Sequence, residues 1–275
     1  MFSRFFILFG FLASLTLSTF PQDYHPPVDF KILLSGTFGE LRGNHFHAGI
    51  DIKTEGVEGQ KIYSIADGYV SRIKVSTWGY GKALYITHPD GNTSVYAHLQ
   101  KFSESINDYV VENQYKKENF EIQLFPPKDK FMVKRGEVIG LSGNTGSSAG
   151  AHLHFEIRNT KTEHPINPLQ FFDVEDNIKP TISKIKLYAI DGSIDREFQD
   201  KSYILKKDEN QYTIKDETPI VKGKIAFSIS TFDKLNNAYN KNGVYAIKLF
   251  IDSNLIYHFQ MDEFSFAESR YINAH

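Results

Sequence analysis

The chain has 275 residues, of which 41% are hydrophobic and 14% aromatic, enough for one large or two ordinary domains with packed cores. Its 31 basic and 33 acidic residues give a formal net charge of -2, so composition offers no electrostatic basis for binding nucleic acid or another polyanion. It contains no cysteine, which excludes disulfide bonds and the acylated cysteine of a lipoprotein.

Residues 1–22 are typical of a secretory signal peptide. Arg4 precedes an apolar run from Phe5 to about Leu17, and small polar residues follow it. This run is shorter than the roughly 20 apolar residues that a membrane-spanning helix requires, and no later segment could cross a bilayer. We therefore expect export to the periplasm or cell envelope, and no integral membrane segment after the signal is cleaved.

Short strands are expected to fill residues 23–175. Apolar and polar residues alternate on both sides of Asp67 and Gly68 within residues 61–75, which predicts two strands joined by a turn. Further strands are expected at residues 83–88 and 93–98, as a second hairpin, and at residues 133–141 and 152–158.

An insertion at about residues 101–131 interrupts these strands. Residues 103–116 keep an approximate helical spacing of apolar side chains, and this is the one helical pattern between the strands. The insertion fits the wall of a groove and a solvated surface element equally well.

A second unit, residues 176–275, is expected to form an Ig-like β-sandwich. Strands with polar turns between them are expected at residues 182–188, 222–230, 244–252 and 255–261. The chain ends without a turn or polar tail, so we expect the module to be truncated. Its strands fit a module that binds a protein partner or the cell wall, and equally a spacer. The predicted fold class is all-β.

Five side chains that bind metals or carry protons occur at the ends of short strand-like runs. His152 and His154 alternate in a strand, which directs both imidazoles to the same side of a sheet. His98 ends an earlier strand, and His47 and Asp51 enter another. Catalytic zinc sites use three protein ligands with nitrogen or oxygen donors and keep a position for water. The set therefore predicts three zinc ligands and two residues that handle protons, and leaves their assignment open.

The spacing of His47 and Asp51 requires a bend. Four positions of a straight strand rise by roughly 13 Å, too far for one ion. Gly49 can supply a bend ahead of a strand that begins at Ile50. His45 competes with His47 for the same role, because it lies two positions away on the same face of an extended chain.

Together these residues resemble the lysostaphin and LytM family of zinc metalloendopeptidases, which cut peptides of the bacterial cell wall. The resemblance spans about residues 36–167. It includes the motifs Ala66-Asp67-Gly68, Gly79-Tyr80-Gly81, Gly136-Glu137-Val138-Ile139-Gly140 and Gly143-Asn144-Thr145-Gly146-Ser147-Ser148. It implies a LytM-type antiparallel β catalytic domain with a short helical insertion, ahead of the β-sandwich module.

The resemblance also implies the roles of the five side chains. His47, Asp51 and His154 would bind Zn²⁺, and His98 and His152 would form the catalytic pair. The implied reaction is hydrolysis of peptide bonds in peptidoglycan stem peptides or crosslinks by zinc-activated water, so peptidoglycan peptides are the expected partner. Which member of the pair is the base stays open, although His152 is favoured.

Substrate contacts are expected from Tyr80, Asn144 and Thr145. Ala151 departs from the commonest family pattern, in which proline often precedes the first histidine of the pair. This departure concerns the rigidity of the loop and leaves metal binding unaffected.

Two other functions remain as alternatives. One is a non-catalytic LytM-type regulator of other cell-wall hydrolases, which the presence of all five side chains disfavours. The other is histidine phosphotransfer without a metal, which Asp51 and the expected export disfavour.

Overall fold

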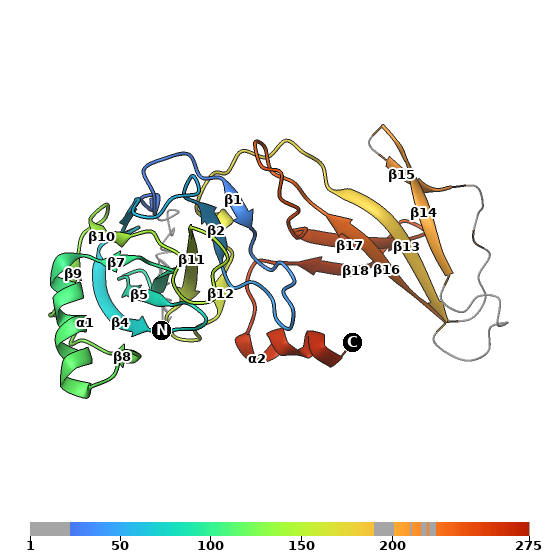
Figure 1. The fold of residues 1–275 in the computed structure, drawn as a ribbon. Helices are drawn as coiled ribbons and strands as arrows, with labels where there is room; N and C mark the ends of the chain where they lie inside the picture. Colours follow the sequence, from blue (N-terminus) through green and yellow to red (C-terminus); the bar gives the residue numbers. More distant parts are fainter. Residues whose placement is uncertain (1–22, 190–200, 210, 216–218, 220–223, 275) are drawn as a thin grey trace, which may run out of the picture.

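A computed structural model describes residues 23–189, 201–209, 211–215, 219 and 224–274. The expected signal peptide, residues 1–22, lies outside the described residues. The chain forms mostly antiparallel β-sheets, which confirms the all-β fold class. In Figure 1 the strands β1 to β12 form one group, and the strands β13 to β18 extend away from it. No described helix is long and apolar enough to span a membrane.

A nine-stranded antiparallel sheet organises residues 23–175, which we call the N-terminal region. Its main path runs β1-β2-β11-β6-β5-β4-β8, with β12 beside β11 and β9 beside β4. The strands are β1 (Leu34–Gly36), β2 (Ile50–Lys53), β4 (Gly68–Val75), β5 (Lys82–Thr87), β6 (Asn92–Ala97), β8 (Ile122–Leu124), β9 (Met132–Val133), β11 (His152–Asn159) and β12 (Pro165–Ile166). The central strands are almost continuously buried, because β-branched and aromatic side chains fill both faces of the sheet.

The hairpin expected for residues 61–75 is wrong, because its two strands belong to different sheets. The strand β3 (Lys61–Tyr63) pairs with β10 (Val138–Leu141), which also pairs with β7 (Lys101–Phe102), whereas β4 belongs to the large sheet. The Asp67 carboxylate accepts a hydrogen bond from the backbone N–H of Arg135 at 2.9 Å, so the turn is attached to a distant segment. The expected strand at 133–141 is also divided, at Gly136 with φ 77°.

The hairpin of β5 and β6 and the helix of the insertion agree with expectation. Leu84 lies opposite Tyr96 in the antiparallel pair. The helix α1 (Glu104–Lys117) ends at Glu118, whose φ of 49° is left-handed. Ile106 and Val110 of this helix are buried in the main core, so one face of the insertion packs against the sheet.

In the described part of residues 176–274, which we call the C-terminal region, the strands form two separate sheets. One has the strand order β15-β14-β13-β16 and the other pairs β17 with β18. The strands are β13 (Thr181–Ala189), β14 (Lys201–Asp208), β15 (Gln211–Ile214), β16 (Ile225–Phe232), β17 (Ala246–Ile251) and β18 (Asn254–Gln260). The Ig-like arrangement stays a prediction, and β14 and β15 were not anticipated.

The end of the chain returns to the N-terminal region (Figure 1). The helix α2 (Phe266–Ser269) is followed by the 3-10 helix η3 (Arg270–Ala274). The backbone N–H of Phe46 donates to Ser269 Oγ at 2.8 Å, and Asn273 Nδ2 donates to the Asn44 carbonyl at 3.0 Å. These bonds hold the loop ahead of β2, which leads into the candidate site.

Candidate metal centre

The register of two neighbouring strands brings Asp51 and His154 together. The strands β2 and β11 are antiparallel, and Asp51 lies directly opposite His154. Ile50 and Ile52 flank Asp51 with no exposed surface and fix its strand in the core. On the other side of β11, His154 lies opposite Ala97, the last residue of β6, so His98 follows at the same end of the sheet.

His47 reaches the same place through the bend expected at Gly49. A Cβ atom at position 49 would lie 2.2 Å from the carbonyl oxygen of Phe155, closer than any side chain tolerates. Glycine therefore allows the segment before β2 to approach the backbone of β11. The backbone N–H of His47 donates to the Glu40 carbonyl at 2.8 Å, which fixes the loop on its other side.

Three donor atoms converge at this point. His47 Nε2 lies 3.1 Å from Asp51 Oδ1 and 3.0 Å from His154 Nδ1, and the last two atoms are 2.9 Å apart. All three side chains are buried. They form the one group of three or more histidine, cysteine or acidic residues within the described ranges that could hold a metal ion.

The remaining ring nitrogens of the two histidines bind acceptors. His47 Nδ1–H donates to the carbonyl of Thr37 at 2.8 Å, and His154 Nε2–H donates to Glu156 Oε1 at 2.8 Å. Each bond fixes the orientation of the ring and turns its other nitrogen toward the cluster, which is the usual support of a metal-binding imidazole.

Glu156 connects this support to a buried network. The side chain has no exposed surface, and its Oε2 accepts from Arg158 Nε at 2.6 Å. The hydroxyl of Tyr80 also donates to Glu156. Burial opposes ionisation of Glu156, but the charge of Arg158 and the hydrogen bond from His154 outweigh it and lower its pKa to about 2. Glu156 is therefore an ionised, fixed partner of His154.

Asp51 is held on both of its oxygen atoms. While Oδ1 faces the imidazoles, Oδ2 accepts from Arg42 Nη2 at 2.9 Å. Burial alone would raise the pKa of Asp51, but its contacts with the imidazoles of His152, His154 and His47 hold that pKa well below its usual range. The carboxylate is thus ionised and oriented with Oδ1 toward the cluster.

His98 and His152 lie beside the cluster, with their ring centroids 4.8 Å apart. His98 Nδ1–H donates to the Thr145 carbonyl at 2.8 Å, and His152 Nδ1–H donates to the Gly150 carbonyl at 2.8 Å. His152 Nε2 lies 3.5 Å from Asp51 Oδ1. Burial, followed by the nearby His154, lowers the pKa of His98 to about 4. Both imidazoles have Nδ1 anchored and Nε2 without a backbone acceptor.

A cavity of about 890 Å³ contains all five side chains. Tyr80 lines it, with its ring stacked on His154 at 5.1 Å. Thr145 holds His98 by its carbonyl, and its hydroxyl bonds the backbone of Lys82 and Leu99. Asn144 is exposed and outside the cavity lining. The substrate contacts expected of Tyr80, Asn144 and Thr145 stay predictions.

Two other expectations concern the edge of this cavity. His45 lines it, but its ring binds Asn44 at 2.7 Å and does not join the three donor atoms. No residue of α1 lines the cavity, so the helix does not form a wall of this groove.

The sequence analysis missed the residues that support the cluster. Glu156 could have been found, because it lies two positions after His154 on the same face of a strand. Thr37 and Arg42 act through a backbone carbonyl and a long side chain in a loop, and no pattern in the sequence marks them.

Comparisons with known proteins agree with this site. Residues 45–115 and 125–168 match the family model of peptidase family M23. The matched ranges include His47, Asp51, His98, His152 and His154.

Curated relatives also match a part of the chain. The DD-carboxypeptidase/endopeptidase Mpg of Neisseria meningitidis serogroup B is 33% identical over 123 residues, which are 45% of this chain and 22% of that protein. The glycyl-glycine endopeptidase ALE-1 of Staphylococcus capitis is 29% identical over 42% of this chain and 24% of its own length. The chain therefore spans about a fifth to a quarter of the length of these relatives.

A solved structure described as a zinc containing peptidase from Vibrio cholerae shares 28% identity, with a TM-score of 0.38 over 51% of this chain and 37% of that chain. The match to the family model confirms the resemblance stated from the sequence: residues 45–115 and 125–168 are similar to peptidase family M23, the lysostaphin and LytM type of metallopeptidase.

Proposed function

We propose that the chain is a zinc metalloendopeptidase that hydrolyses peptide bonds in peptidoglycan stem peptides or crosslinks. The observation that carries this proposal is the convergence of His47, Asp51 and His154 in a cavity of a family M23 domain. Two imidazoles and one carboxylate are a usual ligand set of catalytic zinc.

The donor atoms fit a zinc ion. Tetrahedral zinc with bonds of about 2.0 to 2.1 Å places neighbouring ligand atoms about 3.3 Å apart. The three separations here are 2.9, 3.0 and 3.1 Å, so a small movement of the side chains would accommodate the ion. With three protein ligands, a fourth position is available for water, as catalytic zinc requires.

Bound zinc would polarise the scissile carbonyl and lower the pKa of a water molecule. The proton transfers are assigned to the catalytic pair. Because Gly150 holds Nδ1–H of His152, Nε2 is free to accept the proton of the attacking water and to return it to the leaving amine. His98 lies beside it and is placed to hydrogen-bond the reacting groups.

Three features support the wider assignment. The family and the names of the relatives support a peptidase acting on cell-wall peptides. The apolar run in residues 1–22 supports a signal peptide and export to the periplasm or cell envelope. The end of the large sheet supports a division near residues 175 and 176, with the C-terminal region as a separate module.

Separate measurements of zinc content and turnover test this proposal. Asp51→Ala and His154→Ala should each lose stoichiometric zinc in elemental analysis, whereas His152→Ala should keep zinc and no longer digest purified peptidoglycan. His45→Ala serves as the matched control, because its imidazole lines the cavity outside the cluster, and it should retain both properties.

Three results would contradict the assignment. Full zinc content in His154→Ala would remove the proposed ligand set. Digestion at the unaltered rate by His152→Ala would remove the proposed base. A zinc-loaded protein that cuts no wall peptide would support the non-catalytic regulator instead.

A further inference from the structure

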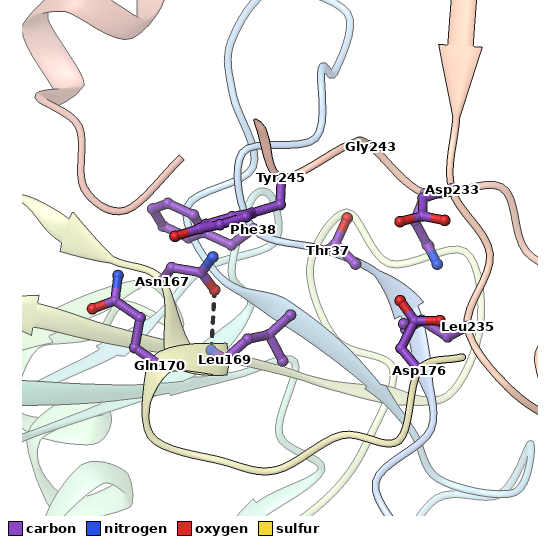
Figure 2. A pocket seen from close by; sticks show the side chains of 11 residues that line it. Thr37, Phe38, Asn167, Leu169, Gln170, Asp176, Asp233, Leu235, Gly243 and Tyr245 are labelled. Atoms are coloured by element: carbon purple, nitrogen blue, oxygen red, sulfur yellow. Dashed lines mark hydrogen bonds between the residues drawn. The ribbon is translucent and has the colours of Figure 1, made fainter. Parts of the chain in front are cut away.

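A second cavity, of about 350 Å³, lies where the N-terminal and C-terminal regions meet (Figure 2). We call it the junction cavity. Its walls include Thr37 and Phe38 after β1, Leu169 of the 3-10 helix η1 (Pro168–Gln170), and Asp233 and Tyr245 from the segments beside β16 and β17. None of its lining residues lines the cavity around His47. Its volume is within the range of small-ligand sites.

Two residues that line this cavity have buried polar side-chain atoms without partners among the described residues. Asn242 is only 3% exposed, yet within that described part of the chain neither its Nδ2 nor its Oδ1 has a hydrogen-bond partner. The hydroxyl of Thr37 is also buried and without a partner. Buried polar groups in folded proteins nearly always have hydrogen-bond partners, so these groups indicate a site that a polar ligand completes.

Two carboxylates face the same cavity. Asp176 accepts a hydrogen bond from the backbone N–H of Ile178 at 3.0 Å, and Asp233 accepts one from that of Lys234 at 2.8 Å. In the described part of the chain, neither carboxylate forms an ion pair. Burial raises the pKa of Asp233, and the charge of Asp176 raises it further. A cation between them would relieve this repulsion.

The other walls favour an organic cation over a metal ion. Phe38, Leu169, Leu235 and Tyr245 supply apolar surface to the cavity, and Figure 2 shows the two aromatic side chains on one side and Asp176 and Asp233 on the other. A calcium ion requires six to eight oxygen ligands around it, which apolar walls do not offer. The described residues also form no cluster of three metal-binding side chains here.

We propose that the junction cavity binds a primary alkylammonium group on an apolar stem, with Asp176 and Asp233 as the counter-charges. The apolar stem packs against Phe38 and Leu169. Asn242 Oδ1 accepts from the ammonium group, while Asn242 Nδ2 and the Thr37 hydroxyl donate to an oxygen atom of the ligand. A lysine residue within a peptide carries all three features, namely the charge, the stem and a nearby carbonyl.

The first test compares ligands on the full chain by calorimetry. Nα-acetyl-lysine N-methylamide should bind saturably, and its uncharged analogue Nα-acetyl-norleucine N-methylamide should bind at least about tenfold more weakly. Equal affinity for the two compounds, or binding of neither, would overturn the proposal. Pentylamine distinguishes a free alkylamine from a lysine residue within a peptide. If pentylamine binds as tightly as the lysine derivative, the amine and its stem are sufficient. If pentylamine binds more weakly, the peptide groups of the lysine derivative contribute to recognition.

The second test compares two variants. Asp233→Asn removes one charge but keeps an oxygen acceptor for the N–H of Lys234, and it should weaken binding of the lysine derivative about tenfold or more. Asp252→Asn is the matched control, because residue 252 is exposed in the turn between β17 and β18, away from the cavity lining. Unchanged affinity in Asp233→Asn would overturn the proposal.

Ligand binding in the junction cavity does not require the proposed peptidase activity. A His154→Ala variant that has lost zinc should still bind the lysine derivative saturably, because His154 does not line this cavity. Failure of zinc binding and failure of amine binding are therefore distinguishable, and the ligand comparison on the unaltered chain does not depend on the folding of a variant.

Discussion

The two regions of the molecule bury their strands to very different extents. In the N-terminal region, β6 and β11 are almost completely buried, and this frame holds the five side chains of the metal centre. In the C-terminal region, β17 and β18 contain no buried residue, and Phe250 and Tyr257 are exposed. Rigid packing thus accompanies the residues that must converge, whereas the C-terminal sheets tolerate open faces.

The largest effect is expected from breaking the buried network under the metal centre. Glu156→Gln should lower the free energy of unfolding by about 3 to 5 kcal/mol, because Arg158 would remain as an uncompensated buried charge. It should also weaken zinc binding about 10- to 100-fold through the altered support of His154. Urea unfolding and competition with a zinc chelator measure the two effects.

Glu163→Gln is the control for this variant. Glu163 lies 3.8 Å from Arg158, but its side chain is 70% exposed, so its removal should change stability by at most about 1 kcal/mol. An unchanged zinc affinity in Glu156→Gln would show that the negative charge of Glu156 does not support the metal centre, because glutamine keeps an oxygen acceptor for His154.

An isoleucine-to-alanine substitution in each region tests whether the two regions bury their strands to different extents. Ile73→Ala in β4 removes a side chain with no exposed surface and should cost about 2 to 5 kcal/mol of unfolding free energy. Ile204→Ala in β14 removes a side chain that is 71% exposed and should change it by less than about 0.5 kcal/mol. Similar losses in urea unfolding would mean that the exposed face of β14 is covered in solution.

A methyl group added at Gly49 is expected to disturb the packing of the segment before β2 against β11. Gly49→Ala would place Cβ against the Phe155 carbonyl and should destabilise the protein by about 1 to 3 kcal/mol, with weaker zinc binding because β2 carries Asp51. Gly43→Ala is the control, since no atom lies within 4 Å of its added Cβ. Equal thermal stability and zinc content in the two variants would argue against the close approach at residue 49.

The smallest effect is a pH dependence from a buried histidine of the N-terminal region. Burial lowers the pKa of His88 below its usual 6.5, and its ring bonds Ser94 and the Asp67 carbonyl. The unfolded chain therefore takes up the proton first, so stability is full above pH 6.5 and declines as pH falls toward the folded pKa, by at most about 1.4 kcal/mol per pH unit.

Comparison of unfolding in urea between pH 7 and pH 5 measures this dependence. His88→Gln should reduce the slope of stability against pH, whatever its effect on stability at pH 7. An identical slope in the variant would assign the dependence to other groups.

Local patterns were sufficient for much of the N-terminal region. The β5 and β6 hairpin and α1 follow from alternation, a four-residue turn and helical spacing, all of which act within a short stretch of chain. The wrong pairing of residues 61–63 has a non-local cause, because β3 is completed by β10 more than 70 positions later. The strands β14 and β15 were missed because exposed lysine and other polar residues interrupt their apolar pattern.

The candidate site was accessible from sequence for a related reason. His152 and His154 lie on one strand, His47, Asp51 and His98 stand at the ends of other strand-like runs, and the resemblance supplied the roles of the five residues. The supporting residues were not accessible, because Thr37 acts through its backbone carbonyl and Arg42 reaches Asp51 from a loop. Any residue type can accept a hydrogen bond through its backbone carbonyl, so the sequence does not indicate which residue does so.

Thr37 contacts both the metal centre and the junction cavity. Its carbonyl holds His47, and its unpartnered hydroxyl lines the junction cavity. A ligand in the junction cavity that displaces Thr37 would also move the carbonyl oxygen that holds His47. If the ligand changes the affinity of the proposed metal centre for zinc by some factor, zinc must change the affinity for the ligand by the same factor. Thr37 would then couple ligand binding in the junction cavity to zinc binding at the proposed metal centre.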